Sequence, residues 1–251
     1  MTSSPDVLPP LRTARVRRTG LVAALIVAPW LLVLANGAGL IETSHGGNDT
    51  TGAGALALAA AHSGLYRFAM VTAMLGSLVM VPATIGVMRL IGFRAARLGL
   101  IGGTLTAGAY IAYFAMNSGD RFQLAMVSRG DTGAEFGKII DTSLNGASVV
   151  WYFLLFAVGS LVGTFLLGLA LRRGRLVPWW AAAAVMAWSV LKVPEFLGVR
   201  VAEILGSVLL AIGFAVVARA LGRQPLPAGT QPQVGEHGEH PAVVALGVNQ
   251  S

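Results

Sequence analysis

The sequence predicts an all-α fold, a polytopic transmembrane helix bundle of about six spans with both termini in the cytoplasm. Three observations favour it. Hydrophobic residues make up 55% of the 251 residues and charged residues only 12%, which is about half the charged share of soluble domains. The uncharged runs approach or exceed the roughly 20 residues that a bilayer requires. The arginines and lysines gather between those runs. A water-soluble enzyme and a disordered polypeptide are therefore excluded.

The predicted spans are separated by charged or turn-forming residues. They cover about residues 20–41, 65–88, 98–116, 147–171, 176–191 and 199–217. The first run is longer than the apolar stretch of about 7 to 15 residues in a cleaved signal peptide, so we expect it to be retained. We divide the chain into a basic, mostly disordered N-terminal segment (1–18), a membrane domain (19–221) and a disordered polar tail (222–251), because the terminal segments have little apolar surface to bury.

The distribution of positive charge predicts the orientation. With a cytoplasmic N-terminus, twelve basic residues lie on the inner side and six on the outer side, as the preference of basic residues for the cytoplasm requires. The charge is spread over short connections next to the spans, which disfavours nucleic acid as a partner. We predict a multi-pass protein of the cell membrane whose partners are lipids and a lipophilic small molecule; a homodimer or a partner subunit stays open.

The two long connections on the outer side, residues 42–64 and 117–146, hold most of the acidic residues. Residues 53–61 predict either a short surface helix or an extension of the second span. Residues 121–143 predict helical stretches broken by Gly130 and Gly133. Since connections longer than about 12 to 15 residues are often functional, we expect the function at the outer face.

Small residues in two spans predict close helix packing. Gly159 and Gly163 lie in the motif GSLVG, and residues 99–108 contain four further glycines. Such residues let membrane helices approach each other closely. We expect them to pack inside the bundle, with a dimer interface as the alternative.

Ionisable residues gather at the outer ends of the spans, where they are costly and usually face the bundle interior or water. They are Glu42, Lys192, Glu195, Arg200 and Glu203. An interfacial set of salt bridges, with Arg200 and Glu203 at i, i+3, is the alternative to a site.

Aromatic residues occur at the same level as these charges. The candidates are Tyr110, Tyr113, Trp151, Tyr152 and Trp188, and an aromatic belt at the headgroups is the alternative explanation. Acids and aromatics on nearly every helix of one leaflet predict a cavity that opens outward, lined by aromatic faces and one or two carboxyl groups.

Metal and cofactor chemistry has little support in the sequence. The chain has no cysteine, and Glu42, His45, Asp49 and His62 match no established zinc spacing. Walker A, HExxH and GxSxG motifs are absent from the sequence. We therefore predict no metal and no cofactor.

Residues 19–220 resemble the small six-helix membrane proteins of unknown function of actinobacteria. The resemblance depends on four features: basic residues before the first predicted helix, glycines near the end of that helix, the sequence YRFAMV at the start of the second helix, and the sequence RAARLGLIGG in the turn into the third. In size, helix count and outer acids the chain is also similar to the membrane-bound terpene cyclases, and that resemblance implies that acids on membrane helices start a cyclisation.

Protonation-initiated cyclisation needs a neutral carboxylic acid and aromatic faces for a carbocation. We expect the acid to be Glu42 or Glu203. The expected lining is Tyr110, Tyr113, Trp151, Tyr152 and Trp188, and the expected supporting charges are Lys192, Glu195 and Arg200. The alternatives are a small permease or resistance protein and an accessory membrane protein without catalysis.

Overall fold

The computed structural model describes residues 10–44 and 51–224; residues 1–9, 45–50 and 225–251 lie outside the described part. Every regular element within the described ranges is a helix, and those ranges contain no strand. This confirms the all-α prediction. The expectations of disorder at residues 1–9 and in the tail from residue 225 onward, together with His45 and Asp49, fall outside the described residues.

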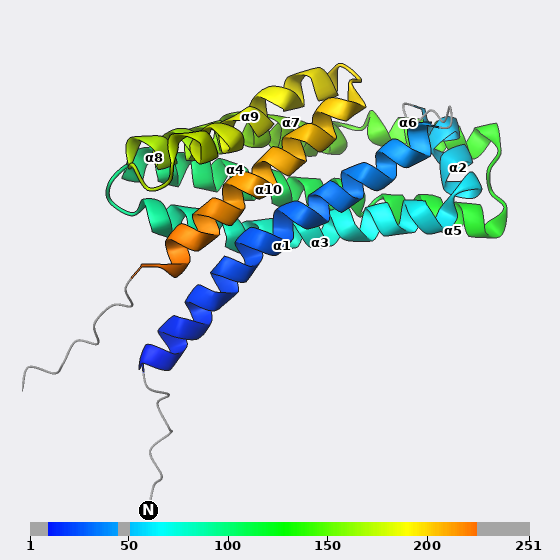
Figure 1. Ribbon diagram of the computed structural model, residues 1–251. Helices are drawn as coiled ribbons and strands as arrows, with labels where there is room; N and C mark the ends of the chain where they lie inside the picture. Colours follow the sequence, from blue (N-terminus) through cyan, green and yellow to red (C-terminus); the bar gives the residue numbers. More distant parts are fainter. Residues whose placement is uncertain (1–9, 45–50, 225–251) are drawn as a thin grey trace, which may run out of the picture.

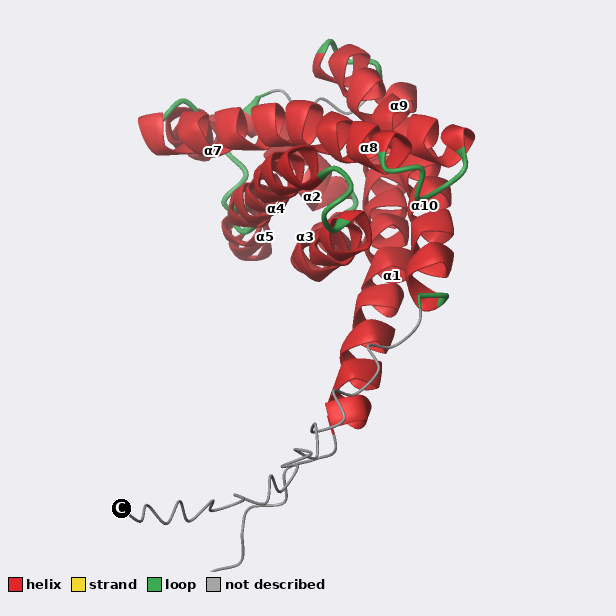
Figure 2. Cartoon of the chain, turned by 90° about the vertical axis from the view of Figure 1, so that its left-hand side faces the viewer, coloured by secondary structure: helices red, strands yellow, loops and turns green. Residues whose placement is uncertain are grey.

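Six helical rods form a closed ring in the described part of the chain (Figures 1 and 2). Each rod packs against two neighbours in the order α1, α3, α4, α7–α8, α9, α10 and back to α1. The bounds are α1 (Pro10–Ser44), α3 (Ser63–Ile91), α4 (Ala96–Asn117), α7 (Ala147–Val158), the π-helical turn η1 (Gly159–Gly163), α8 (Thr164–Arg173), α9 (Trp179–Phe196) and α10 (Arg200–Gly222).

Five helical segments of the described residues are long and apolar enough to cross a membrane. They are Thr13–Ser44, Ser63–Ile91, Ala96–Arg129, Val149–Arg173 and Arg200–Gly222, and they match five of the predicted spans. The remaining predicted span, residues 176–191, corresponds to α9, which begins at Trp179 and is not among the five. Its last five residues include Lys192, Pro194 and Glu195, which lower its hydropathy. The chain is thus a helical protein with several membrane-spanning candidates.

The interior of the ring is apolar, and so is much of its exterior. Buried core side chains come from all six rods, for example Leu25, Met80, Tyr110, Leu167 and Phe214. Large apolar side chains on the outside of the same rods are exposed; they include Ile26, Leu34, Leu78, Ile111, Leu154 and Ile212. Helices that are apolar on both faces fit a lipid surrounding, since the hydrocarbon solvates the outer face.

Helix α1 begins earlier than the predicted domain boundary at residue 18. It starts at Pro10, where proline is favourable because a first-turn residue needs no N–H partner. The basic stretch that follows contains no helix breaker, and arginine has a high helix propensity. The basic segment from residue 10 onward is therefore helical and continuous with the first span.

The small residues of two spans pack inside the bundle, as predicted. A Cβ atom on Gly163 would lie 2.7 Å from the backbone nitrogen of Thr106 in α4, and one on Gly159 would lie 2.8 Å from the Cβ of Ala109. The Thr106 and Thr164 hydroxyls are 3.5 Å apart across the same contact. Rod α7–α8 therefore touches α4 almost backbone to backbone.

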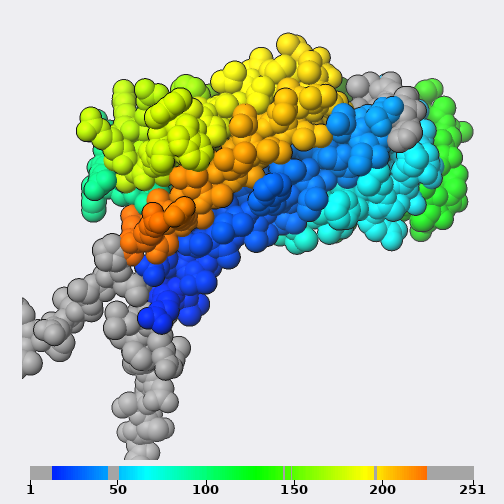
Figure 3. Space-filling model, in the orientation of Figure 1, coloured from blue at the N-terminus to red at the C-terminus, as the bar shows by residue number. Residues whose placement is uncertain are grey.

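Three short helices, α2 (Gly52–Ala61), α5 (Asp120–Arg129) and α6 (Ala134–Leu144), pack together at the end of the bundle where α1 finishes (Figure 3). The backbone N–H of Gly52 donates to the Asp141 carboxylate at 2.6 Å, which ties α2 to α6. Helix α2 is separate from α3, so the surface-helix alternative holds. Residue Gly130, with φ of +82°, ends α5 as the sequence predicted.

Candidate functional site

A cavity of about 310 Å³ lies at this same end, between the bundle and the short helices. Six elements contribute to it. Its lining comprises Ala35, Asn36, Gly39, Glu42 and Thr43 of α1, Ala55 and Leu58 of α2, Tyr66, Ala69, Met70 and Ala73 of α3, Tyr113 and Asn117 of α4, Asp120 and Gln123 of α5, and Arg200 and Glu203 of α10. The chain thus has a cavity at the end where the sequence predicted one.

Two turns place three of the four charged residues of the cavity. After α4 the N–H of Gly119 donates to the carbonyl of Met116 at 3.1 Å, and the chain turns so that Asp120 stands in the first turn of α5. Between α9 and α10, Gly198 adopts a left-handed φ of +91°, which a residue with a Cβ rarely adopts. Arg200 and Glu203 then fall in the first turn of α10, where a carboxylate is favoured by the helix dipole.

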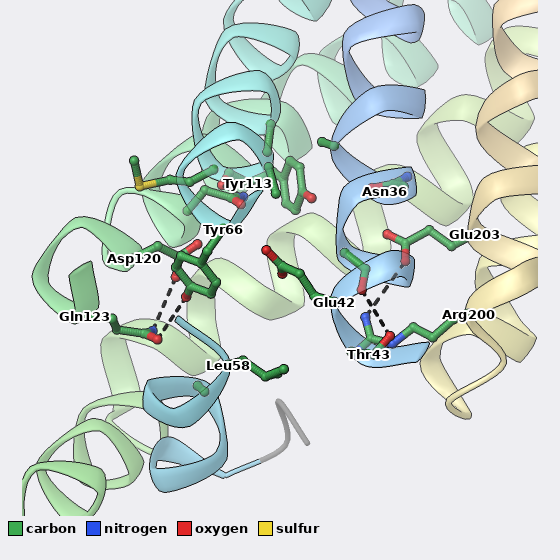
Figure 4. A pocket seen from close by; sticks show the side chains of 17 residues that line it. Asn36, Glu42, Thr43, Leu58, Tyr66, Tyr113, Asp120, Gln123, Arg200 and Glu203 are labelled. Carbon is green, nitrogen blue, oxygen red and sulfur yellow. Dashed lines mark hydrogen bonds and ion pairs between the residues drawn. The ribbon is translucent and has the colours of Figure 1, made fainter. Parts of the chain in front are cut away.

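One wall of the cavity is a chain of hydrogen bonds. The Tyr66 hydroxyl donates to Gln123 Oε1 at 2.9 Å, and Gln123 Nε2 donates to Asp120 Oδ1 at 3.3 Å. The three side chains come from α3 and α5 (Figure 4). They hold a carboxylate, an amide and a phenol in one place, which suits recognition of a polar group.

The opposite wall is an ion-pair set around Glu203. Lys192 Nζ lies 3.8 Å from Glu203 Oε1, and Arg200 Nη1 lies 3.9 Å from Glu203 Oε2. The Lys192 ammonium also lies over two rings, 5.2 Å from the centroid of Trp188 and 5.4 Å from that of Phe156. The predicted i, i+3 pair of Arg200 and Glu203 is present, and the structure adds Lys192 as a second, buried cation.

Glu42 lies between the two walls. Its side chain is only 6% exposed and extends from the last turns of α1 toward the middle of the cavity (Figure 4). Glu203 on the same cavity already faces two cations. The two predicted acids are thus brought together, but their surroundings differ.

The predicted aromatic lining is only partly assembled. Tyr113 borders the cavity and stacks on Phe156 with centroids 4.6 Å apart. Tyr110 and Trp188 line a neighbouring void of about 10 Å³ that Tyr113 and Asn36 also border. The side chain of Glu195, a predicted supporting charge near the end of α9, lies outside the described part.

Trp151 and Tyr152 do not reach the cavity. They are 69% and 46% exposed on α7, because α7 turns its other face, with Phe156, toward α4. Their position on the outside of the bundle fits the aromatic-belt alternative, and the aromatic surface of the cavity is smaller than the sequence predicted.

Several polar lining residues were not predicted from the sequence, among them Asn36, Asp120 and Gln123. Asn36 is an amide inside the first span, where it donates to the Ser207 hydroxyl at 2.7 Å; an uncharged polar residue in an apolar run was the available signal. Asp120 and Gln123 lie just beyond the predicted span at residues 98–116. Their assignment needed the helix to continue past Ser118 and Gly119 into α5, which the glycine at position 119 did not indicate.

The described residues contain no group of three or more histidine, aspartate or glutamate side chains that could hold a metal ion. Fold and site define a class: an all-helical bundle with several membrane-spanning candidates and a polar cavity at one end. No protein family, no curated protein and no solved structure matches this chain.

Proposed function

We propose that the chain crosses the cell membrane six times, with α9 as the additional span and both ends of the bundle domain in the cytoplasm. Support comes from the ring, in which α9 lies between α8 and α10. The last described residue also lies beside the basic start of the first predicted span, since Arg18 donates to the carbonyl of Gln224, and ends on the same side require an even number of crossings. At 1.5 Å per residue the 18 residues of α9 are about 27 Å long, close to the hydrocarbon thickness.

The absence of cysteine makes this topology testable by single cysteine substitutions. We expect a membrane-impermeant thiol reagent to label Val199→Cys and Ser128→Cys in intact cells, but to label Pro178→Cys and Gln224→Cys only after lysis. Positions 178 and 199 flank α9, so equal labelling of these two variants in intact cells would mean that α9 does not cross. All four residues are exposed in the structure.

We infer that the cavity binds a lipophilic small molecule that carries a polar end. The observation that carries this inference is the position of the Glu42 side chain between the Tyr66–Gln123–Asp120 wall and the Glu203 ion pairs (Figure 4). Apolar residues of α2 and α3, such as Leu58 and Met70, complete the lining. A polar end is then recognised by the carboxyl and amide groups, while the remainder of the ligand contacts apolar surface.

The reaction that we propose for this site is the acid-initiated cyclisation of a prenyl chain. The Glu42 carboxyl group donates its proton to one carbon of a terminal double bond, whose electron pair forms the new C–H bond. A second double bond attacks the resulting carbocation and closes the ring, and loss of a neighbouring proton to a carboxylate forms the product alkene. No atom is gained or lost overall, so the reaction needs no cofactor.

The two acids have different roles in this proposal. Glu203 is the counter-ion of Lys192 and Arg200, and the faces of Trp188 and Phe156 are already taken by the Lys192 ammonium. Glu42 is the proposed proton donor because its side chain is buried and extends toward the middle of the cavity, and the rings of Tyr66 and Tyr113 are the aromatic surfaces that line it. We therefore assign proton transfer to Glu42 and positioning to Glu203.

Glu42→Gln tests the assignment, because an amide keeps the shape of the side chain but has no acidic proton. We expect membranes that contain this variant to lose conversion of an aromatic-linked farnesyl or geranylgeranyl substrate by at least about 100-fold, the usual contribution of a general acid. Trp151→Phe, on the outside of α7, is the matched control and should retain activity. Full activity in Glu42→Gln would eliminate Glu42 as the acid.

A small permease is the second candidate function. One observation favours it: the Lys192–Glu203 pair lies inside the bundle, with side chains only 6% and 13% exposed, and buried ionisable pairs often mark ion or substrate paths. Gradient-dependent flux of a substrate into proteoliposomes, without chemical change of that substrate, would select transport over cyclisation.

A further inference from the structure

A second hollow, of about 550 Å³, lies at the opposite end of the bundle from the cavity. It is formed by the connection from α3 to α4, the connection from α8 to α9 and the end of α10, which come together at the left of Figures 1 and 3. Four arginines line it: Arg89, Arg94, Arg175 and Arg223. The α1 helix is held beside it, since Arg18 donates to the carbonyl of Gln224 on its rim.

No acidic residue balances these guanidinium groups within the described part of the chain. The described acidic residues lie in the last turns of α1, in α5 and α6 with their connection, near the end of α9 and in the first turn of α10. All of these segments are at the cavity end. The hollow is therefore a concave surface with positive charge only, which attracts an anion.

The arginines cannot be explained only as partners of helix C-termini. Arg89, in the last turn of α3, does suit the negative end of the helix dipole. Arg94 and Arg175 lie in connections beyond the helices. Arg175 has a φ of 50° and is the left-handed C′ residue of the turn that ends α8, where its N–H donates to the carbonyl of Arg172 and the N–H of Leu176 donates to the carbonyl of Leu171. This capped turn fixes the backbone that carries the Arg175 side chain at the hollow.

Aromatic residues beside the hollow place it at the level of the lipid headgroups. Phe93 is fully exposed at 101%, and Trp179 is 69% exposed at the start of α9. Exposed rings of this kind are enriched where a membrane protein meets the interface. Below them, Leu100 and Ile101 of α4 are 61% and 53% exposed, so apolar surface continues from the hollow along the bundle.

We propose that this hollow binds the phosphodiester headgroup of an anionic phospholipid of the cytoplasmic leaflet. Guanidinium groups pair with phosphate oxygens through two parallel hydrogen bonds, and basic pockets between membrane helices on this side suit such headgroups. The acyl chains can pack on the exposed apolar surface of α4. Inorganic phosphate makes no such contact, so this surface favours a lipid as the ligand. The proposal rests on the proposed membrane topology and is independent of the chemistry in the opposite cavity.

Binding of phosphatidylglycerol to the detergent-purified protein, followed by native mass spectrometry, tests the proposal. We expect retained phosphatidylglycerol in preference to phosphatidylcholine. The double variant Arg94→Gln/Arg223→Gln should bind it about tenfold or more weakly, since each basic residue near an anionic surface contributes roughly a fivefold change. The variant Arg94→Lys/Arg223→Lys keeps the charge and should keep more of the binding than the glutamine variant.

Arg172→Gln/Arg173→Gln is the matched control. It removes the same charge from the same end of the bundle, at two exposed residues outside the hollow, and its melting temperature reports whether charge loss alone affects folding. Equal loss of binding in the control and the test variant would overturn the proposal, because general attraction would then account for binding. Absence of a preference for phosphatidylglycerol, or its displacement by millimolar inorganic phosphate, would overturn the assignment to a lipid.

Discussion

Glu203→Gln is expected to lower the melting temperature of the purified protein by roughly 10 °C, more than Lys192→Met does. Lys192 is 5% exposed and sits between Trp188, Phe156 and Glu203. Removing one partner of a buried ion pair costs about 3 to 5 kcal/mol, because the other charge stays buried without compensation. The glutamine variant leaves two cations facing a neutral amide, whereas the methionine variant leaves Glu203 with Arg200.

The double variant Lys192→Met/Glu203→Gln separates this explanation from simple loss of packing. It removes both buried charges and should recover part of the stability that Glu203→Gln loses, a coupling that a double-mutant cycle measures. Unfolding can be followed in detergent by thermal denaturation with intrinsic tryptophan fluorescence. If the double variant lost more stability than the two single variants lose together, the buried ion pair would not be the cause of the destabilisation.

Gly159→Ala/Gly163→Ala is expected to destabilise the bundle by about 3 kcal/mol or more, because both added methyl groups meet α4. At Gly163 the nearest atoms are the backbone nitrogen and Oγ1 of Thr106, both at 2.7 Å, and at Gly159 they include the backbone carbonyl of Leu105. Backbone atoms cannot swing aside as a flexible side chain does. The two rods must separate, which breaks the packing along the whole contact.

Gly108→Ala is the matched control on the other side of the same pair of rods. The nearest atom to its added Cβ is Leu155 Cδ1, at 4.0 Å, so no atom has to move. Alanine favours a helix over glycine by up to about 1 kcal/mol, and this variant should be as stable as the parent or slightly more stable. Fluorescence-detected size exclusion after heating measures both variants, and equal stability of the two would contradict the close-packing explanation.

Much of the fold could be predicted because lipid imposes strong constraints on sequence. A span needs an uninterrupted apolar run, so the runs at residues 65–88 and 147–171 correspond to α3 and to the rod of α7, η1 and α8. The predicted break at Gly130 is the end of α5, and the predicted break at Gly133 comes directly before the start of α6. The predicted span at residues 176–191 is the one without a counterpart among the five candidate helices, because α9 mixes alanines and tryptophans with Lys192 and Pro194.

The candidate site could be predicted only in part. Glu42, Tyr113, Arg200 and Glu203 border the cavity because each lies near the end of a span on one side of the bundle, and that level can be read from sequence. Which face of a helix a residue occupies depends on how the helix packs. Trp151 lies at a similar level and yet points outward, with 69% of its surface exposed.

The order of residues along the chain is enough to predict a helical bundle with apolar spans, the level at which acids and aromatics gather and the basic end of the molecule. The packing of the helices was needed to show that Lys192 pairs with Glu203 and lies over Trp188, that Asp120 and Gln123 line the cavity, and that four arginines line a hollow. The physical reason is that hydropathy fixes the depth of a residue along the bundle, while side-chain contacts depend on helix rotation and on turns, which packing between distant segments sets.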